Sequence, residues 1–278
     1  MRDFFILTIT SCLISSSLAG FAIDFAGSNI TSAQFSCLQS NGVDVVISRV
    51  YSPDGFIEET GIQNLINAYN GASFLGYNAY ITPCVANCSN NVSSGYDQVS
   101  AVVNRLNAEI NKVNNMFIWV NIDISQPWSK NQNENREFMN EVVLALFKFN
   151  GVFGVISNNN SWSTIFGADY NVNDIAEYLI WVKWNGKQVG VYRVTAKMDN
   201  FEDLTTDWVP FGGWSSPFVH QYAGGITSNK CVPGVKLNYN YFADVNSGPL
   251  MNTKVQKSIN KRRLHRFNRK QYLNTVFL

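Results

Sequence analysis

Residues 116–124, Met-Phe-Ile-Trp-Val-Asn-Ile-Asp-Ile, form an apolar run that ends in polar side chains. One amphipathic helical pattern precedes this run, and a second follows it before the strand-like segment 152–157. The apolar residues at helical spacing are Val99, Val102, Val103, Leu106, Ile110 and Val113 before the run, and Phe138, Val142, Ala145, Leu146 and Phe149 after it. A strand joined to the next by a helix predicts parallel strands connected by crossovers.

The same alternation extends in both directions along the chain. The other strand-like segments are 21–25, 45–51, 74–81, 178–184, 189–194, 218–222 and 235–241. Helical patterns follow Thr31 and cover 62–69, whereas helices become sparse after residue 160. No linker rich in Pro, Gly or Ser interrupts residues 21–248. We therefore expect one α/β domain, a TIM-like (β/α) barrel that is irregular in its second half.

The first twenty residues have the pattern of a cleaved secretory signal. Arg2 precedes an apolar stretch over residues 4–18, and small residues follow at Ala19 and Gly20. The stretch is too short and too rich in Ser and Thr for a membrane anchor. A buried N-terminal helix would leave Arg2 unexplained. The sequence therefore predicts a secreted protein without stable membrane insertion.

Charge is unevenly distributed between the body and the C-terminal tail. Residues 251–278 carry eight of the 21 Lys and Arg residues and no acidic residue, which leaves 13 basic against 20 acidic residues in 1–250, a net charge of −7. Only 15% of the chain is charged and 46% is hydrophobic, which excludes a disordered chain and a nucleic-acid binder driven by charge. We expect residues 249–278 to be disordered; an arm that binds cell wall or membrane is the alternative.

The cysteines favour disulfides. Cys12 would leave with the signal, and the four that remain are an even set: Cys37, Cys84, Cys88 and Cys231. Three pairings are possible, and the sequence does not choose between them. A zinc site at Cys84 and Cys88 is the competing interpretation, but it lacks a second cysteine pair, and His220 is the one histidine of the body. No metal site is expected.

Candidate site residues lie where predicted strands end, because active sites of such barrels form at the carboxyl ends of the strands. These polar residues are Asp24, Asn78, Tyr80, Asn121, Asp123 and Ser157. Asn121 and Asp123 are two residues apart, so on a strand they would point to the same side, which we expect to be the barrel interior. His220, within a strand-like segment, is interpreted as a hydrogen-bonded strand residue rather than a base.

Other catalytic patterns are missing from the sequence. It has no Gly-x-Ser-x-Gly elbow, no P-loop and no Gly-x-Gly-x-x-Gly motif, and one body histidine gives little support for a catalytic triad. Carboxylates combined with abundant aromatic residues indicate carbohydrate chemistry, in which a carboxylic acid protonates the leaving oxygen and a second carboxylate assists. Six tryptophans could stack on sugar rings, although we expect at least half to be core: Trp119, Trp128, Trp162, Trp181, Trp184 and Trp214.

Seven segments follow one another in a distinctive order: Phe21-Ala22-Ile23-Asp24, Gln34-Phe35-Ser36-Cys37-Leu38, Tyr80-Ile81-Thr82-Pro83-Cys84, Trp119-Val120-Asn121-Ile122-Asp123, Gly154-Val155-Ile156-Ser157 with Trp162, Leu179-Ile180-Trp181-Val182-Lys183-Trp184, and Gln221-Tyr222-Ala223-Gly224. Together they resemble the glycoside hydrolase family 25 lysozymes, especially their secreted animal branch. The resemblance covers about residues 21–245 and implies an irregular α/β barrel. It also implies cleavage after N-acetylmuramic acid in bacterial peptidoglycan, without a cofactor, in antibacterial defence.

The sequence departs from the family pattern at the positions that carry the chemistry. The aspartate of the first strand is present as Asp24. The family's Asp-x-Glu, whose Glu donates the proton, is Asn121 and Asp123 here, and a C-terminal Asp is replaced by Lys236.

The resemblance therefore gives two sets of site residues. The catalytic set is Asp123, Asp24 and Asn121, and the substrate-binding set is Asn78, Tyr80, Ser157, Trp181, Gln221 and Lys236. The expected partner is bacterial cell-wall glycan, bound by a monomer that needs no cofactor. Two functions stay open: a weakened peptidoglycan hydrolase, and a catalytically inactive protein that binds glycan or serves signalling.

Overall fold

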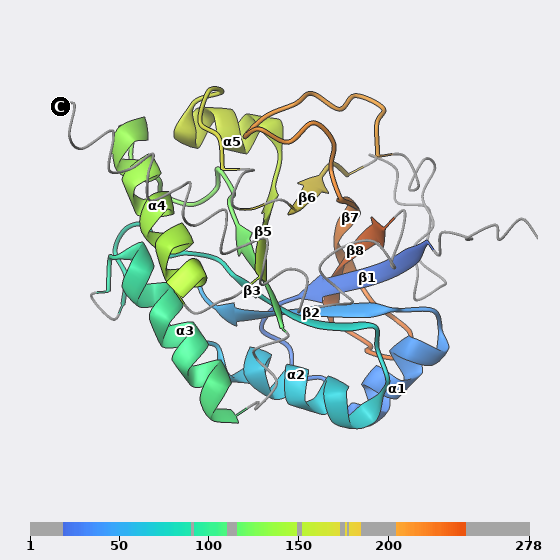
Figure 1. Ribbon diagram of the computed structural model, residues 1–278. Helices are drawn as coiled ribbons and strands as arrows, with labels where there is room; N and C mark the ends of the chain where they lie inside the picture. Colours follow the sequence, from blue (N-terminus) through green and yellow to red (C-terminus); the bar gives the residue numbers. More distant parts are fainter. Residues whose placement is uncertain are drawn as a thin grey trace, which may run out of the picture.

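The computed structural model describes residues 19–89, 92–109, 116–148, 152–172, 176, 178–184 and 204–242. These residues form a closed barrel of eight strands with helices on its outside (Figure 1). The strands are β1 (Gly20–Phe25), β2 (Val45–Tyr51), β3 (Gly76–Ile81), β4 (Phe117–Asn121), β5 (Val152–Ser157), β6 (Tyr178–Val182), β7 (Val219–Thr227) and β8 (Lys236–Phe242). The helices are α1 (Ser32–Ser40), α2 (Glu59–Gly71), α3 (Gly95–Glu109), α4 (Gln132–Lys148) and α5 (Asn159–Phe166).

The barrel is closed by an antiparallel strand. Strands β1 to β7 are parallel to their neighbours in chain order, whereas β8 is antiparallel to both β7 and β1. The predicted α/β barrel is confirmed, and the expectation of parallel strands is wrong for β8. The cause is the short connection between Thr227 and Lys236, because a crossover helix needs a longer one. As a result, β8 begins at the end of the barrel where the parallel strands finish.

Side chains alternate between the barrel interior and the helix layer. In β4, Phe117 and Trp119 belong to the interior cluster, whereas Ile118 and Val120 pack in the cluster beneath the helices. The other buried members of the interior cluster are Ala22, Val45, Ile47, Tyr80, Ile156, Ile180, Val219 and Phe242. The interior is therefore a packed core, and polar groups can gather only towards its ends.

Local sequence signals account for several element ends. Thr31 accepts a hydrogen bond from the backbone of Gln34, whose side chain in turn accepts from the Thr31 backbone, so the predicted capping box is present at the start of α1. No described residue after Phe166 lies in an α-helix, in agreement with the predicted irregular second half. The predicted strand 189–194 and almost all of the predicted signal and tail lie outside the described residues.

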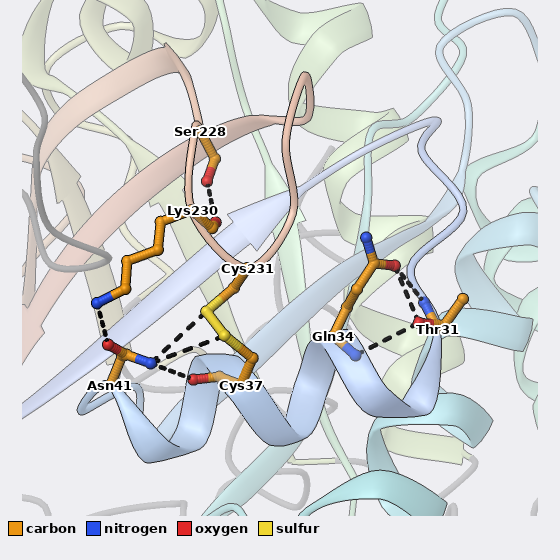
Figure 2. Close-up of a disulfide and its surroundings, with 7 residues drawn as sticks. All are labelled: Thr31, Gln34, Cys37, Asn41, Ser228, Lys230 and Cys231. Carbon is orange, nitrogen blue, oxygen red and sulfur yellow. Dashed lines mark hydrogen bonds between the residues drawn. A yellow bond between two sulfur atoms is a disulfide. The ribbon is translucent and has the colours of Figure 1, made fainter.

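Two disulfides join the four remaining cysteines. Cys37 pairs with Cys231, and Cys84 pairs with Cys88, so the zinc interpretation of the latter two is wrong. Figure 2 shows Cys231, in the loop between β7 and β8, against helix α1. Asn41 donates a hydrogen bond to the Cys37 carbonyl (2.7 Å) and accepts one from Lys230 (2.6 Å), which adds polar contacts to this cross-link. The cross-link ties the β7–β8 hairpin to the first helix.

None of the helices in the described part of the chain has the length and apolar character needed to cross a membrane.

Candidate active site

Asp24, near the end of β1, is buried in a shell of three side-chain amides. Gln221 and Asn240 each donate to its Oδ2 at 2.8 Å, and Asn238 donates to its Oδ1 at 2.7 Å. Only 2% of the residue is exposed. Burial raises the pKa of the Asp24 carboxyl above 3.8, and the three amide hydrogen bonds partly oppose that rise because they stabilise the charged form.

The shell follows from the antiparallel position of β8. Asp24 lies opposite Asn238 in the β1–β8 register, and Asn238 and Asn240 face the same side of their strand. Leu237 and Tyr239, which alternate with them, pack in the outer apolar cluster. We did not predict the two asparagines, although a polar residue at every second position from Lys236 onward is a signal that could have revealed them.

Strand β3 contributes Asn78 and Tyr80 to the interior side. Both are nearly buried, with 3% and 7% exposed. Burial, together with the nearby charge of Asp24, raises the pKa of the Tyr80 hydroxyl far above its ordinary value, so this group stays neutral. The Nδ2 of Asn78 has no hydrogen-bond partner among the described residues. Tyr80 therefore lies in the electrostatic field of Asp24, as the shared placement at strand ends suggests.

An ion pair on β2 was not predicted. Arg49 donates from Nε to one carboxylate oxygen of Glu58 (2.9 Å) and from Nη2 to the other (2.6 Å). Arg49 lies on the same face of β2 as the interior residues Val45 and Ile47, and it interacts electrostatically with Tyr80. A charged residue within an otherwise apolar β-branched strand was the available signal. The pairing with Glu58 neutralises a cation that interacts with Tyr80.

Asn121 and Asp123 occupy different environments. Asn121 is the last residue of β4 and donates from Nδ2 to the Thr82 hydroxyl at 3.3 Å. Asp123 lies beyond the strand in a turn, where its Oδ1 accepts from the backbone of Ser125 (2.7 Å) and its carbonyl accepts from the Trp128 indole (3.0 Å). β4 ends at Asn121 and is shorter than the predicted strand 116–124. Asn121 therefore lies on the interior face of the strand, as expected, whereas Asp123 lies outside the strand. Asp123 is a partly exposed loop carboxylate.

The other predicted substrate-binding residues are spread around the end of the barrel. Ser157 is buried and donates to the carbonyl of Ile122 at 2.9 Å. Trp181, 5% exposed, stacks on His220 with ring centroids 5.1 Å apart. Lys236 is exposed at the first position of β8. Of the whole predicted set, Gln221 is the one with a direct bond to Asp24 among the described residues.

Two expectations about individual aromatic side chains are confirmed. Four of the six tryptophans are buried core residues, namely Trp119, Trp162, Trp181 and Trp214, while Trp184 is 56% exposed. His220 is buried, and its Nε2 lies 2.8 Å from the carbonyl of Lys183, as a hydrogen-bonded strand residue would. The described residues contain no group of His, Cys, Asp and Glu side chains arranged to bind a metal ion.

Two strands at this end of the barrel carry carboxyl groups of different character. Asp24 is buried near the carboxyl end of β1 and has a raised pKa, whereas Asp123 is partly exposed just beyond the end of β4. Pairs of carboxyl groups in distinct environments at this end of a barrel are the arrangement used for glycosidic bond cleavage.

Comparisons with known proteins specify the family. A family model described as lysozyme-like protein 1 matches residues 15–222. Lysozyme-like protein 5 of Caenorhabditis elegans is 27% identical over 86% of this chain and 99% of its own length. The probable family 25 lysozyme 2 of Dictyostelium discoideum is 28% identical over 81% of this chain and 92% of its own length. The chain belongs to the lysozyme-like proteins of glycoside hydrolase family 25.

Solved structures agree on the fold. A family 25 lysozyme from Aspergillus fumigatus superposes with a TM-score of 0.57 at 11% identity, covering 86% of this chain and 98% of that one. A lysozyme from Streptomyces coelicolor gives the same TM-score at 16% identity, covering 89% and 99%. At these identities the likeness establishes the distorted β/α barrel.

Proposed function

We propose that the protein is secreted and acts on bacterial peptidoglycan in antibacterial defence, with hydrolysis weakened by its altered active site. The observation that carries the proposal is Asp24, buried at the end of the barrel where such enzymes work and bonded by three amides. A carboxyl with a pKa raised by burial is a common feature of functional sites. The family relationship supplies the substrate class.

The proposed weakening rests on three side chains. Asn121 has no charge with which to stabilise an oxocarbenium-like transition state. Asp123 is one methylene shorter than the glutamate expected in the family, which withdraws its carboxyl by about 1 Å and can reduce the rate by roughly a hundredfold. Lys236 is exposed at the start of β8, on the same side of that strand as Asn238. Its positive charge opposes the positive charge that develops during cleavage.

In this proposal Asp123 acts as the acid and Asp24 as its electrostatic partner. The partial exposure of Asp123 lets it reach a bound glycan, whereas Asp24 acts from a fixed, buried position. Asn78 and Tyr80 lie on the interior side of β3, where the buried amide nitrogen of Asn78 has no hydrogen-bond partner among the described residues. Binding groups of this kind stabilise the ground state as well as the transition state, so glycan binding outlasts the loss of catalytic charge.

Secretion is supported by the two disulfides and by the pattern of residues 1–20. Disulfides persist in oxidising compartments, outside the reducing cytosol. Mass spectrometry of the protein purified from a secreting host tests this point. Loss of the first twenty residues is the expected result, and an intact N-terminus would contradict it.

The test of function is a turbidity assay on purified peptidoglycan, run beside a pull-down on the same material. We expect binding together with slow or undetectable clearing. Combining Asn121→Asp with Asp123→Glu should raise the clearing rate, and adding Lys236→Asp should raise it further, in a non-additive way because the groups act on one charge distribution. Asp169→Glu, on a carboxylate that is 81% exposed and paired with Arg136, is the matched control and should change nothing.

The outcomes separate the two candidate functions. Strong clearing by the unmodified protein that is lost on Asp123→Ala would refute the weakening and show that the shorter acid suffices. Binding without clearing in the triple variant would favour the second candidate, a lysozyme-like protein that binds glycan without cleaving it. Neither binding nor clearing would defeat the proposed function altogether.

A further inference from the structure

Exposed apolar side chains gather at the end of the barrel that holds Asp24. Of the large apolar residues that are exposed in the described part of the chain, Phe56, Ile124, Trp184 and Val209 lie in the connections that leave β2, β4 and β6. Trp184 is distinct because the other tryptophans at or near this end are largely covered. An indole that is 56% exposed, two residues beyond a barrel strand, has no evident role in the core.

One face of the Trp184 ring rests on the backbone of β7. A Cβ atom built on Gly224 would lie 2.1 Å from Cζ2 and 2.3 Å from Cε2 of the indole, far inside van der Waals contact. The ring therefore lies against the glycine, and any larger residue there would displace it. Lys183, the residue before Trp184, donates its backbone N–H to the Gln221 carbonyl at 3.1 Å. This hydrogen bond holds the backbone that carries the indole against β7.

The edge of the ring is fixed by a hydrogen bond that continues to Asp24. The indole Nε1 donates to the Gln221 Oε1 at 3.1 Å, and the Gln221 Nε2 donates to the Asp24 Oδ2 at 2.8 Å. Both neighbours specify the orientation of the Gln221 amide, because an indole can only donate and a carboxylate can only accept. The exposed ring is thus fixed on one face and along one edge, and it is connected to the buried carboxyl through a single side chain.

We propose that the open face of Trp184 is a binding platform for a sugar ring of the glycan, set beside Asp24 by Gln221 and Gly224. This inference rests on the proposed function and adds to it the subsite that receives the ring. The electron-rich face of an indole attracts the C–H groups on the apolar face of a pyranose, and a ring that is fixed beforehand loses little entropy on binding.

The test measures the affinity of full-length variants for soluble peptidoglycan fragments by isothermal titration calorimetry. Trp184→Ala should weaken binding by about tenfold or more, since it removes the whole platform. Gly224→Ala keeps the indole but pushes it off the sheet, and it should weaken binding by a similar factor. Trp184→Phe retains an aromatic face without the N–H group, and it should fall between these variants and the unmodified protein.

The matched control is Phe56→Ala, which removes an aromatic side chain of similar exposure (47%) from the connection after β2, on the opposite side of the barrel from β6. Its affinity should stay within about twofold of the unmodified protein. Thermal unfolding of each variant checks that the fold is retained, and Trp184→Phe keeps the test decisive if Gly224→Ala fails to fold.

The outcomes distinguish a failure of the platform from a failure of the proposed function on which it rests. An unmodified protein that does not bind the fragments overturns the proposed function, and the platform with it. An unmodified protein that binds while Trp184→Ala binds equally well overturns the platform alone. Equal losses in Trp184→Ala and Phe56→Ala would also overturn it, because a general apolar rim would then explain the binding.

Discussion

The two carboxyl groups of the candidate site belong to regions that are built differently. The Asp24 region comprises β1, β7, β8 and the Cys37–Cys231 disulfide, and its carboxyl receives three amide hydrogen bonds in a buried position. The Asp123 region comprises the ends of β3 and β4 with the Cys84–Cys88 disulfide, and its carboxyl accepts one backbone hydrogen bond in a partly exposed turn. Asp24 is buried within the barrel, whereas Asp123 lies in a turn beyond the end of β4.

Under the proposed function, this difference explains how one site can combine a retained residue, Asp24, with an altered one, Asp123. A change at Asp24 leaves buried amide donors without partners, which costs stability as well as function. A change at Asp123 disturbs the packing less, because this side chain is partly exposed. Under the proposed function, the barrel keeps its glycan-binding end while the strength of the acid varies.

The largest expected difference between the regions lies in their disulfides. Cys37–Cys231 spans 194 residues and Cys84–Cys88 spans four. Because a cross-link restricts the unfolded chain more when it closes a longer loop, Cys37→Ser with Cys231→Ser should lower the free energy of unfolding by about 4–5 kcal/mol. Cys84→Ser with Cys88→Ser should lower it by less than about 3 kcal/mol. Urea unfolding of both double variants measures this, and equal losses would contradict the contrast.

Substitution of the carboxyls should give the next largest difference. Asp24→Ala removes the acceptor of three amides and should cost at least about 3 kcal/mol, whereas Asp123→Ala should cost less than about 1 kcal/mol. Asp24→Asn, which keeps the shape and one acceptor, should lie between them. Urea unfolding at mildly acidic pH measures all three. A similar cost for Asp24→Ala and Asp123→Ala would show that the amide shell contributes little.

The sequence predicts the strands better than their pairing around the site. The β-branched run at 45–51 matches β2 in full, because it is buried on both faces and reads as a continuous apolar segment. The reversal of β8 was missed because strand direction depends on the length of the β7–β8 connection, which no apolar pattern encodes. Asn238 and Asn240 were missed with it, since their position opposite Asp24 exists only in the antiparallel register.

The disulfide pairing, like the strand pairing, could not be predicted from the sequence. The even number of cysteines predicts two cross-links, but Cys37 and Cys231 become neighbours only when the hairpin folds onto α1. The end of β4 was also predicted wrongly, because the apolar pattern continues through Ile122 and Ile124 after the strand has ended, and Asp123 was placed on the strand for that reason. Tertiary contacts, and not local preference, fix these features.

Stability should depend on pH through Asp24. Burial raises its pKa in the native state above the unfolded value near 3.8, so the native protein binds this proton more tightly than the unfolded chain does. The contribution of the protonated group is fully present below pH 3.8 and is lost as the pH rises through the native pKa. The free energy of unfolding of the unmodified protein, minus that of Asp24→Asn, should therefore decrease across this range, by at most about 1.4 kcal/mol per pH unit. A difference that rises with pH would mean that the amide shell outweighs desolvation.

The smallest effect is expected at the hydrogen bond between Asn121 and Thr82. Thr82→Val keeps the buried volume but removes the hydroxyl that accepts from the Asn121 amide at 3.3 Å. Asn121 is partly exposed and can turn to water, so the cost should be below about 1 kcal/mol, in contrast to the cost of disturbing the amides around Asp24. Asn240→Leu is the corresponding change in the Asp24 region, because it removes one donor from the buried Oδ2, and it should cost more. Urea unfolding of the two variants makes the comparison. If Thr82→Val were the more destabilising of the two, the Asp123 region would contribute as much to stability as the Asp24 region. The contrast between the two regions could then not explain the proposed alteration at Asn121 and Asp123.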